Sequence, residues 1–199
     1  MKRQDVQISA PISLRLPLPE DLSFLHAGDR VLLTGPVLSA RDAAHRRLIE
    51  KWEAGEEEPL FSVDGETIYY TGPCPAPPGR AAGSAGPTTS GRMDVYMPAL
   101  LARGLRGTIG KGPRSPAVVA AIAAHGAVYF AALGGAGALC AQCIERAEEI
   151  AYPDLGAEAV RRLWLKDLPV VVAVDSAGRD LYHEGPLAYS RAVPGEGAP

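Results

Sequence analysis

The sequence has few cysteines, no long uninterrupted apolar run and almost no net charge, and each shortage excludes a class of protein. Its three cysteines, Cys74, Cys140 and Cys143, are an odd number and argue against a disulfide framework. The longest apolar stretch, residues 117–137, is interrupted by His125 and several glycines, so we expect no membrane span. A net charge of −3 provides no basic face for nucleic acid.

The first residues also lack the apolar core of a signal peptide, so we expect a cytoplasmic protein. The 199 residues are enough for one domain with a real core, and 47% hydrophobic and 22% charged residues are ordinary for a globular chain. We predict a single domain over residues 1–185, followed by a Pro/Gly-rich tail over residues 186–199 that forms a loose end.

The pattern of apolar residues predicts an α/β fold, with a mixed sheet and flanking helices. Strands are expected at residues 6–16, 29–35, 67–71, 107–110, 127–133 and 169–174. The last of them is expected to form a hairpin with residues 180–182. Helices are expected at residues 39–54, capped by Ser39 and Asp42, and at residues 93–103, 115–126 and 138–150.

A stiff loop that leads into a helix start is the first candidate anion site. Residues 84–94 contain glycines and a proline, then three hydroxyls and Arg92. Free backbone N–H groups, hydroxyls and a guanidinium at a helix start suit a carboxylate or a phosphate. The same residues could instead form an elaborate helix N-cap beside a solvent-exposed arginine. The long Gly/Pro-rich segment at residues 72–91 favours the anion site.

Two further cationic positions are ambiguous by pattern. Arg41 and His45, four residues apart, share one face of the expected helix, but this spacing alone favours a surface arginine and a half-buried histidine. Lys111 stands between glycines after an expected strand, where open α/β sheets place ligand-binding groups. A loop lysine and a binding lysine fit that position equally well.

The remaining motifs favour packing over chemistry. Residues 134–137 resemble part of a dinucleotide fingerprint but lack its last glycine, so they indicate close helix packing. Three cysteines could hold an iron–sulfur cluster with one open iron, but Cys140 and Cys143 fall within an expected helix and suit buried apolar positions. The residues therefore indicate an anion-handling domain for a small dicarboxylate, with no metal site of its own.

Four segments together resemble the β subunit of the iron–sulfur-dependent fumarase and L(+)-tartrate dehydratase family, which is equivalent to the C-terminal domain of single-chain class I fumarases. The most specific is the block Gly-Pro-Thr-Thr-Ser-Gly-Arg-Met. The resemblance covers roughly residues 5–185, and the segments that carry it are residues 40–48, 70–73, 83–94 and 110–112.

The resemblance implies a swivelling β/β/α domain that works only with a larger α subunit. That partner would supply three cysteines to a [4Fe–4S] cluster, and this chain would bind no metal. The open iron would act as a Lewis acid in the reversible hydration of fumarate to (S)-malate, at a site between the two subunits. The family suggests an α2β2 assembly or a homodimer of this chain.

The family's functional residues can be placed on this sequence one by one. Thr88 matches the threonine proposed as the base for the C3 proton, Thr89 lies beside it as a contact, and His45 matches a histidine regarded as catalytic. The residues that match those binding the substrate carboxylates are Arg41, Arg92 and Lys111.

Gly91 and the Pro-rich run at residues 74–79 favour fumarate over tartrate as the substrate. An L(+)-tartrate dehydratase β subunit is the alternative, and mesaconate hydration is a possible second activity. Two alternatives belong to other functional classes. The chain could be a dicarboxylate-binding module without catalysis, or it could carry an iron–sulfur cluster itself.

Overall fold

The structure is a computed structural model that describes residues 10–56 and 60–192. The predicted strand residues 6–9 and the tail residues 193–199 lie outside the described residues. The strands are β1 (Ile12–Arg15), β2 (Arg30–Ser39), β3 (Thr67–Tyr69), β4 (Gly107–Gly110), β5 (Val128–Ala132), β6 (Ile144–Ala151) and β7 (Val160–Val174). The α-helices are α1 (Asp42–Glu53), α2 (Met97–Ala102), α3 (Pro116–Ala124), α4 (Gly137–Gln142) and α5 (Leu181–Ala192), and the 3-10 helices are η1 (Ser90–Met93) and η2 (Pro153–Glu158).

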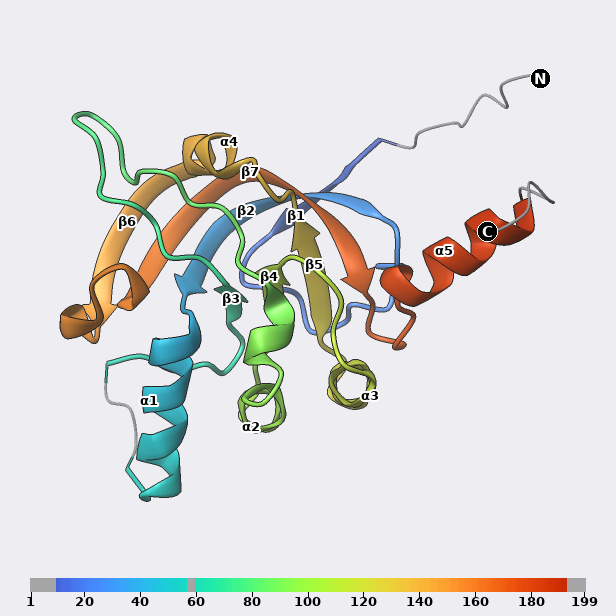
Figure 1. Cartoon of the computed structure of the whole chain (residues 1–199), viewed down its shortest axis with the longest axis horizontal. Coiled ribbons are helices and arrows are strands. Elements are labelled where there is room, and N and C mark those ends of the chain that lie inside the picture. Colours follow the sequence, from blue (N-terminus) through green and yellow to red (C-terminus); the bar gives the residue numbers. More distant parts are fainter. Residues whose placement is uncertain (1–9, 57–59, 193–199) are drawn as a thin grey trace, which may run out of the picture.

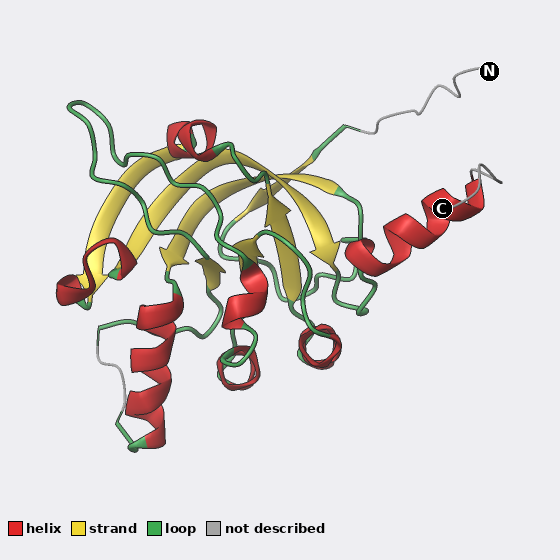
Figure 2. Ribbon diagram, viewed as in Figure 1, coloured by secondary structure: helices red, strands yellow, loops and turns green. Residues whose placement is uncertain are grey.

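All seven strands belong to one mixed sheet that closes on itself. The strand order is β1-β2-β3-β4-β5-β7-β6, and β2 also pairs with β7. The first five strands run parallel to their neighbours, whereas β7 is antiparallel to β2, β5 and β6. The closed ring therefore consists of β2, β3, β4, β5 and β7, with β1 and β6 at the edges. Figures 1 and 2 show helices α1, α2 and α3 together below the arched sheet.

The two faces of the sheet carry separate apolar cores because neighbouring residues in a strand point to opposite faces. Tyr69 and Phe130 belong to one core, which the loop around Ala82 also packs against. Tyr70 and Tyr129, their neighbours in sequence, belong to the other core, with the buried sides of α1, α2 and α3. The mixed sheet with flanking helices that the sequence predicts is confirmed.

Local signals place several elements correctly. The Ser115 hydroxyl accepts a hydrogen bond from the Val118 N–H at 3.4 Å, and Pro116 occupies the first position of α3. This start matches the predicted cap, because proline suits the first helical turn, where its missing N–H has no partner to lose. No helix among the described residues has the length and apolar character that a bilayer crossing requires.

The predicted cap of α1 is wrong. Ser39 is the last residue of β2, and Arg41 occupies the N-cap position without a side-chain capping bond. The carboxylate of Glu158 accepts a hydrogen bond from the Ala43 N–H at 2.8 Å instead. A residue from η2 therefore satisfies the helix start that a local hydroxyl was expected to cap.

The C-terminal third differs most from the predictions. Residues 144–151 form β6 instead of continuing a helix, and β7 starts at Val160, well before the predicted residue 169. The predicted hairpin is reduced to one bridge between Val174 and Asp180. Residues 181–192 form α5, so the loose tail predicted from residue 186 is a helix as far as residue 192. Its Pro186 lies within the helix.

Candidate functional site

The predicted cations follow strands that end at the same edge of the sheet. β2, β3 and β4 are parallel neighbours, so their carboxyl ends lie side by side. Arg41 lies two residues after β2, and Lys111 directly follows β4. Ligands of open α/β sheets bind at this edge because loops there can project residues from several strands into one place.

The segment Thr88–Ser90 is inserted between the extensions of β3 and β4. The Thr88 N–H donates to the Tyr70 carbonyl oxygen at 2.7 Å, and the Lys111 N–H donates to the Thr88 carbonyl oxygen at 3.2 Å. The Ser90 N–H donates to the Lys111 carbonyl oxygen at 2.9 Å, and Thr89 pairs with Lys111 as a parallel bridge. These bonds bring the backbones of the two threonines and the lysine together.

Arg92 connects this segment to the start of α1. Its Nη2 donates to the Thr88 hydroxyl oxygen at 2.8 Å and to a carboxylate oxygen of Asp42 at 2.8 Å. The Arg92 side chain is 47% exposed, so the remaining face of its guanidinium is open to solvent. A guanidinium that is held on one side and open on the other is prepared to bind a carboxylate.

Arg41, at the N-cap of α1, lies beside the backbone of Gly72. Its Nη2 is 3.5 Å from a Glu158 carboxylate oxygen, and its buried Nε has no hydrogen-bond partner among the described residues. A Cβ atom on Gly72 would lie 2.9 Å from Arg41 Nη1 and 2.8 Å from the Ala157 carbonyl oxygen. Gly72 is therefore the residue whose small size lets Arg41 lie where it does.

A buried ion pair supports the loop from below. Arg114 Nε donates to Asp94 at 2.6 Å, and the second carboxylate oxygen of Asp94 accepts from the Ser115 N–H at 2.7 Å. The Arg114 guanidinium lies over the rings of Tyr70 and Tyr129, at 5.5 and 5.2 Å from their centroids. Asp94 ends the sequence block that contains Thr88 and Arg92, so this pair ties the block to α3.

The structure places His45 below the site instead of on its surface. The residue is 1% exposed, and its Nδ1 lies 2.8 Å from the Arg41 carbonyl oxygen. Burial lowers the pKa of His45 to about 4, so the ring is neutral near pH 7 and its Nδ1–H donates to that carbonyl. Its Nε2 has no hydrogen-bond partner in the described part of the chain. The two predicted site residues Arg41 and His45 therefore differ in position. Arg41 is partly exposed at the N-cap of α1, and His45 is buried within α1.

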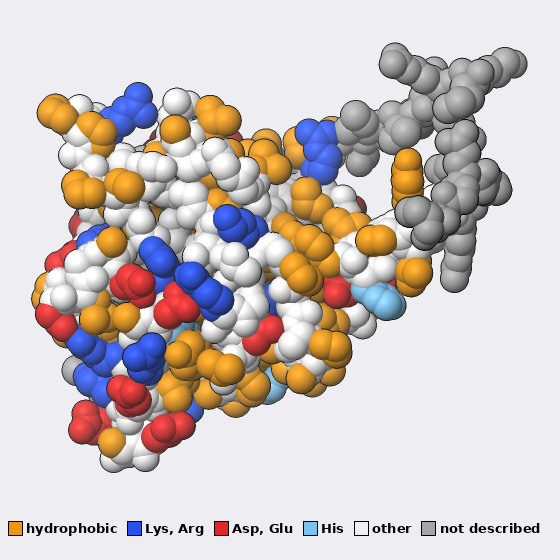
Figure 3. Space-filling model, viewed as in Figure 1, with side chains coloured by type: hydrophobic (Ala, Val, Ile, Leu, Met, Phe, Trp, Pro, Cys, Tyr) orange, Lys and Arg blue, Asp and Glu red, His pale blue; other side chains and the backbone are white. Residues whose placement is uncertain are grey.

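The site itself is an open, charged surface. Figure 3 shows Lys and Arg side chains interleaved with Asp and Glu side chains over α1 and the loops above it. A hollow of about 660 Å³ lies elsewhere, between α3 and the start of α5, and none of the six predicted site residues lines it. Apart from the buried His45, these residues therefore lie on a face that a second surface would have to cover to enclose a substrate.

The cysteines of this chain do not fit an iron–sulfur cluster. Cys74 is exposed, Cys140 is buried in α4, and burial raises the pKa of the Cys143 thiol, which disfavours the thiolate that iron requires. No group of three or more His, Cys, Asp or Glu side chains within residues 10–56 and 60–192 could hold a metal ion.

The sequence does not reveal that two acidic residues, Asp42 and Glu158, are partners of the arginines of the site. The sequence predicts a helix-capping role for Asp42, whereas in the structure Asp42 accepts a hydrogen bond from Arg92, 50 residues away. Glu158, which pairs with Arg41 and caps α1, belongs to η2 and has no local sequence signal that connects it to either.

Comparisons with known proteins identify the family of this chain. Residues 2–185 match the family described as "Fumarase C-terminus". The anaerobic class I fumarate hydratase of Escherichia coli (strain K12) is 39% identical over 180 residues, which are 87% of this chain and 32% of that protein. Fumarate hydratase 2 of Leishmania major is 38% identical over 179 residues, 87% of this chain and 31% of that protein. The chain thus spans about a third of the length of these fumarate hydratases.

A relative of similar length is a separate subunit. The putative L(+)-tartrate dehydratase subunit beta of Methanocaldococcus jannaschii is 35% identical over 171 residues, which are 83% of this chain and 87% of that subunit. The chain therefore belongs to the class I fumarate hydratase and L(+)-tartrate dehydratase family and corresponds to its β-subunit-like C-terminal domain.

Proposed function

We propose that the chain is the β subunit of a two-subunit, [4Fe–4S]-dependent fumarate hydratase that reversibly hydrates fumarate to (S)-malate. The observation that carries the proposal is the hydrogen bond from Arg92 to Thr88, whose backbone is bonded in turn to Lys111. A guanidinium, a hydroxyl and the backbone of a lysine are thereby held together at one edge of the sheet.

The cations suit a substrate with two carboxylates. Arg92 and Arg41 offer planar guanidinium groups, and each is already held by an acidic neighbour, Asp42 or Glu158. Lys111 supplies a point charge from the adjacent strand end. Arginine binds a carboxylate through two parallel hydrogen bonds, so it also orients the substrate, whereas lysine adds attraction with less directional constraint.

Thr88 is the residue we propose to exchange a proton with carbon C3 of the substrate. A free hydroxyl is a weak base, so it needs help to carry negative charge. The Arg92 guanidinium donates to its oxygen at 2.8 Å, which stabilises the charge that develops when the hydroxyl loses its proton. His45, buried and neutral, would act by holding the Arg41 backbone and not by touching the substrate.

The exposure of the site favours the proposal that a partner subunit covers it. Charge stabilisation is much stronger where water is excluded, and the predicted site residues other than His45 lie on a surface that the described part of this chain does not cover. We propose that an α subunit covers this face, holds the [4Fe–4S] cluster and completes an α2β2 assembly. When bound there, the cluster would supply a Lewis acid for the substrate's hydroxyl and carboxylate.

Co-expression tests the proposal. The chain alone and the chain with its α subunit are reconstituted with iron and sulfide without oxygen, and the ultraviolet absorbance of fumarate is followed. Hydration by the pair and not by either chain alone is the expected result. A cluster spectrum from this chain alone would contradict the assignment of the cluster to the partner, and binding of fumarate without turnover by the pair would indicate a dicarboxylate-binding module.

The second candidate is an L(+)-tartrate dehydratase β subunit. It is favoured by one observation, the match over 87% of a relative that carries that name and is itself a separate subunit. Assaying the reconstituted pair with L(+)-tartrate, mesaconate and fumarate distinguishes the substrates, and we expect the highest kcat/KM with fumarate.

A further inference from the structure

We propose that Tyr182, in the first turn of α5, is a positioning residue that sets the geometry of Lys111 through the backbone of Gly112. This inference rests on the proposed function, because it assigns Lys111 to a substrate carboxylate. Tyr182 belongs to α5, and none of the sequence motifs of the site lies in this helix.

Two tyrosine hydroxyls hold Gly112 from opposite ends of the residue. The Gly112 N–H donates to the Tyr182 hydroxyl oxygen at 3.1 Å, and the Tyr129 hydroxyl donates to the Gly112 carbonyl oxygen at 2.8 Å. Gly112 has a φ of +80°, a left-handed conformation that few other residues adopt. Since glycine is also free to leave this conformation, its two hydrogen bonds define the path of the chain immediately after Lys111.

The peptide groups of Lys111 itself are fixed by the inserted segment. Its N–H donates to the Thr88 carbonyl oxygen at 3.2 Å, and its carbonyl oxygen accepts from the Ser90 N–H at 2.9 Å. The N–H and carbonyl groups of Lys111 and Gly112 thus form the four hydrogen bonds described above. Only the bond to Tyr182 involves α5, a helix that does not belong to the group α1, α2 and α3. Tyr182 therefore connects α5 to the site.

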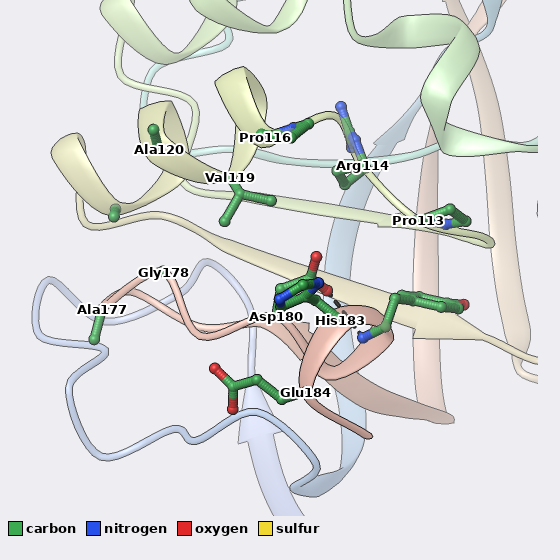
Figure 4. Close-up of a pocket in the computed structure, with 12 residues that line it drawn as sticks. Pro113, Arg114, Pro116, Val119, Ala120, Ala177, Gly178, Asp180, His183 and Glu184 are labelled. Carbon is green, nitrogen blue, oxygen red and sulfur yellow. Dashed lines mark hydrogen bonds between the residues drawn. The ribbon is translucent and has the colours of Figure 1, made fainter. Parts of the chain in front are cut away.

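The hydrogen bond between Tyr182 and Gly112 links α5 to the segment that follows Lys111. Figure 1 shows α5 running away from the body of the protein. Its first turn faces α3 across a hollow of about 660 Å³, in which Asp180, His183 and Glu184 lie opposite Pro116 and Val119 (Figure 4). The helix start is therefore separated from α3 by open space, and the Tyr182 hydroxyl reaches past it to Gly112. A shift of α5 would be passed to Lys111 by this contact.

Removing one oxygen atom tests the contact. Tyr182→Phe keeps the ring, which is 40% exposed, and removes only the hydrogen-bond acceptor. In the reconstituted pair we expect the KM for fumarate to rise about two- to twelvefold, the range that the loss of one hydrogen bond of about 0.5–1.5 kcal/mol gives. We expect kcat to change less than twofold, because Lys111 would bind the carboxylate equally in the ground and transition states. Tyr189→Phe, an exposed tyrosine on the same helix, is the matched control and should leave KM unchanged.

A double-mutant cycle separates positioning from general stability. If Tyr182 acts through Lys111, adding Tyr182→Phe to a Lys111→Ala variant has no further effect on KM, whereas an independent structural role gives additive effects. Amide hydrogen exchange of the Gly112 peptide in the assembled pair provides a second readout that does not need activity, and exchange should be faster in Tyr182→Phe. Lack of fumarate hydration by the wild-type pair would refute the proposed function while leaving the exchange measurement valid. Unchanged exchange, an unchanged KM or additive effects would each overturn the role of Tyr182.

Discussion

Arg92 and Thr88 share a hydrogen bond of 2.8 Å between the guanidinium Nη2 and the hydroxyl oxygen, and the same nitrogen is held by Asp42. The pair is four residues apart, at the start of η1, where the chain leaves the segment inserted between β3 and β4. Neither side chain is buried, so the bond faces the open side of the site. This geometry makes Thr88 a hydroxyl with a fixed cation beside it.

Thr88→Ala is expected to lower kcat of the reconstituted pair by about 10²–10⁴-fold, the contribution of a positioned acid or base. Thr88→Ser keeps the hydroxyl and should retain most of the turnover. Both variants should co-purify with the α subunit, because the Thr88 backbone provides the hydrogen bonds to Tyr70 and Lys111. Turnover of the alanine variant close to that of the wild type would show that Thr88 does not exchange the proton.

Arg92→Lys is expected to raise the KM for fumarate roughly tenfold or more, since hydrogen bonds to charged groups contribute about 1.5–3 kcal/mol. Lysine keeps the charge but cannot form two parallel bonds to a carboxylate or reach both Asp42 and Thr88 with one planar group. Steady-state kinetics of the pair measure the change. A KM equal to that of the wild type would place Arg92 outside the substrate site.

Gly72→Ala is expected to displace Arg41 and weaken substrate binding. The new Cβ would lie 2.9 Å from Arg41 Nη1 and 2.8 Å from the Ala157 carbonyl oxygen, so either the side chain or the backbone must move. We expect the KM for fumarate to rise in steady-state kinetics of the pair. We expect the free energy of unfolding, measured by urea denaturation, to fall by about 1–3 kcal/mol, the cost of an overpacked site.

The control for this change is Gly185→Ala in α5, whose Cβ would make an ordinary contact of 3.7 Å with Leu181. It should leave KM unchanged and should not lower stability, because alanine favours a helix more than glycine does. If Gly72→Ala behaves like this control, Arg41 does not depend on the space that Gly72 leaves.

The parts of the fold predicted correctly are those in which local signals agree with packing. Ser115 and Pro116 mark the start of α3 because both act within one helical turn. Residues 144–150 fall within the helix that the sequence predicts after the Gly-rich turn at residues 134–137, and alanine and glutamate are common in helices. They form β6 because pairing with β7 satisfies their backbone, a non-local interaction that overrides propensity.

The same division applies to the site. The position of Lys111 at the end of a strand could be predicted, because its glycine-flanked segment directly follows an expected strand. The partner of Arg41 could not, because Glu158 reaches α1 from 115 residues beyond Ala43 and only the folded chain brings them together. Acidic partners that orient cations are set by tertiary contacts, so sequence spacing alone does not reveal them.

His45 is expected to make the protein less stable in mild acid. Burial lowers its pKa to about 4, whereas an unfolded histidine titrates near 6.5. Between these values the unfolded chain binds a proton that the folded chain does not, so the free energy of unfolding falls as pH drops from 6.5 towards 4. The loss between pH 7.5 and pH 5.0 should be about 2 kcal/mol, at about 1.4 kcal/mol per pH unit.

Urea unfolding at these two pH values measures the effect. In His45→Gln no proton can be taken up at this position, so its stability should depend less on pH by about the same 2 kcal/mol, even if the variant is less stable overall. His125→Gln changes an exposed histidine and should keep the pH dependence of the wild type. Equal pH dependence in all three proteins would mean that His45 is accessible to protons in the folded chain, and the histidine would then be available to the reaction and not only to the packing beneath Arg41.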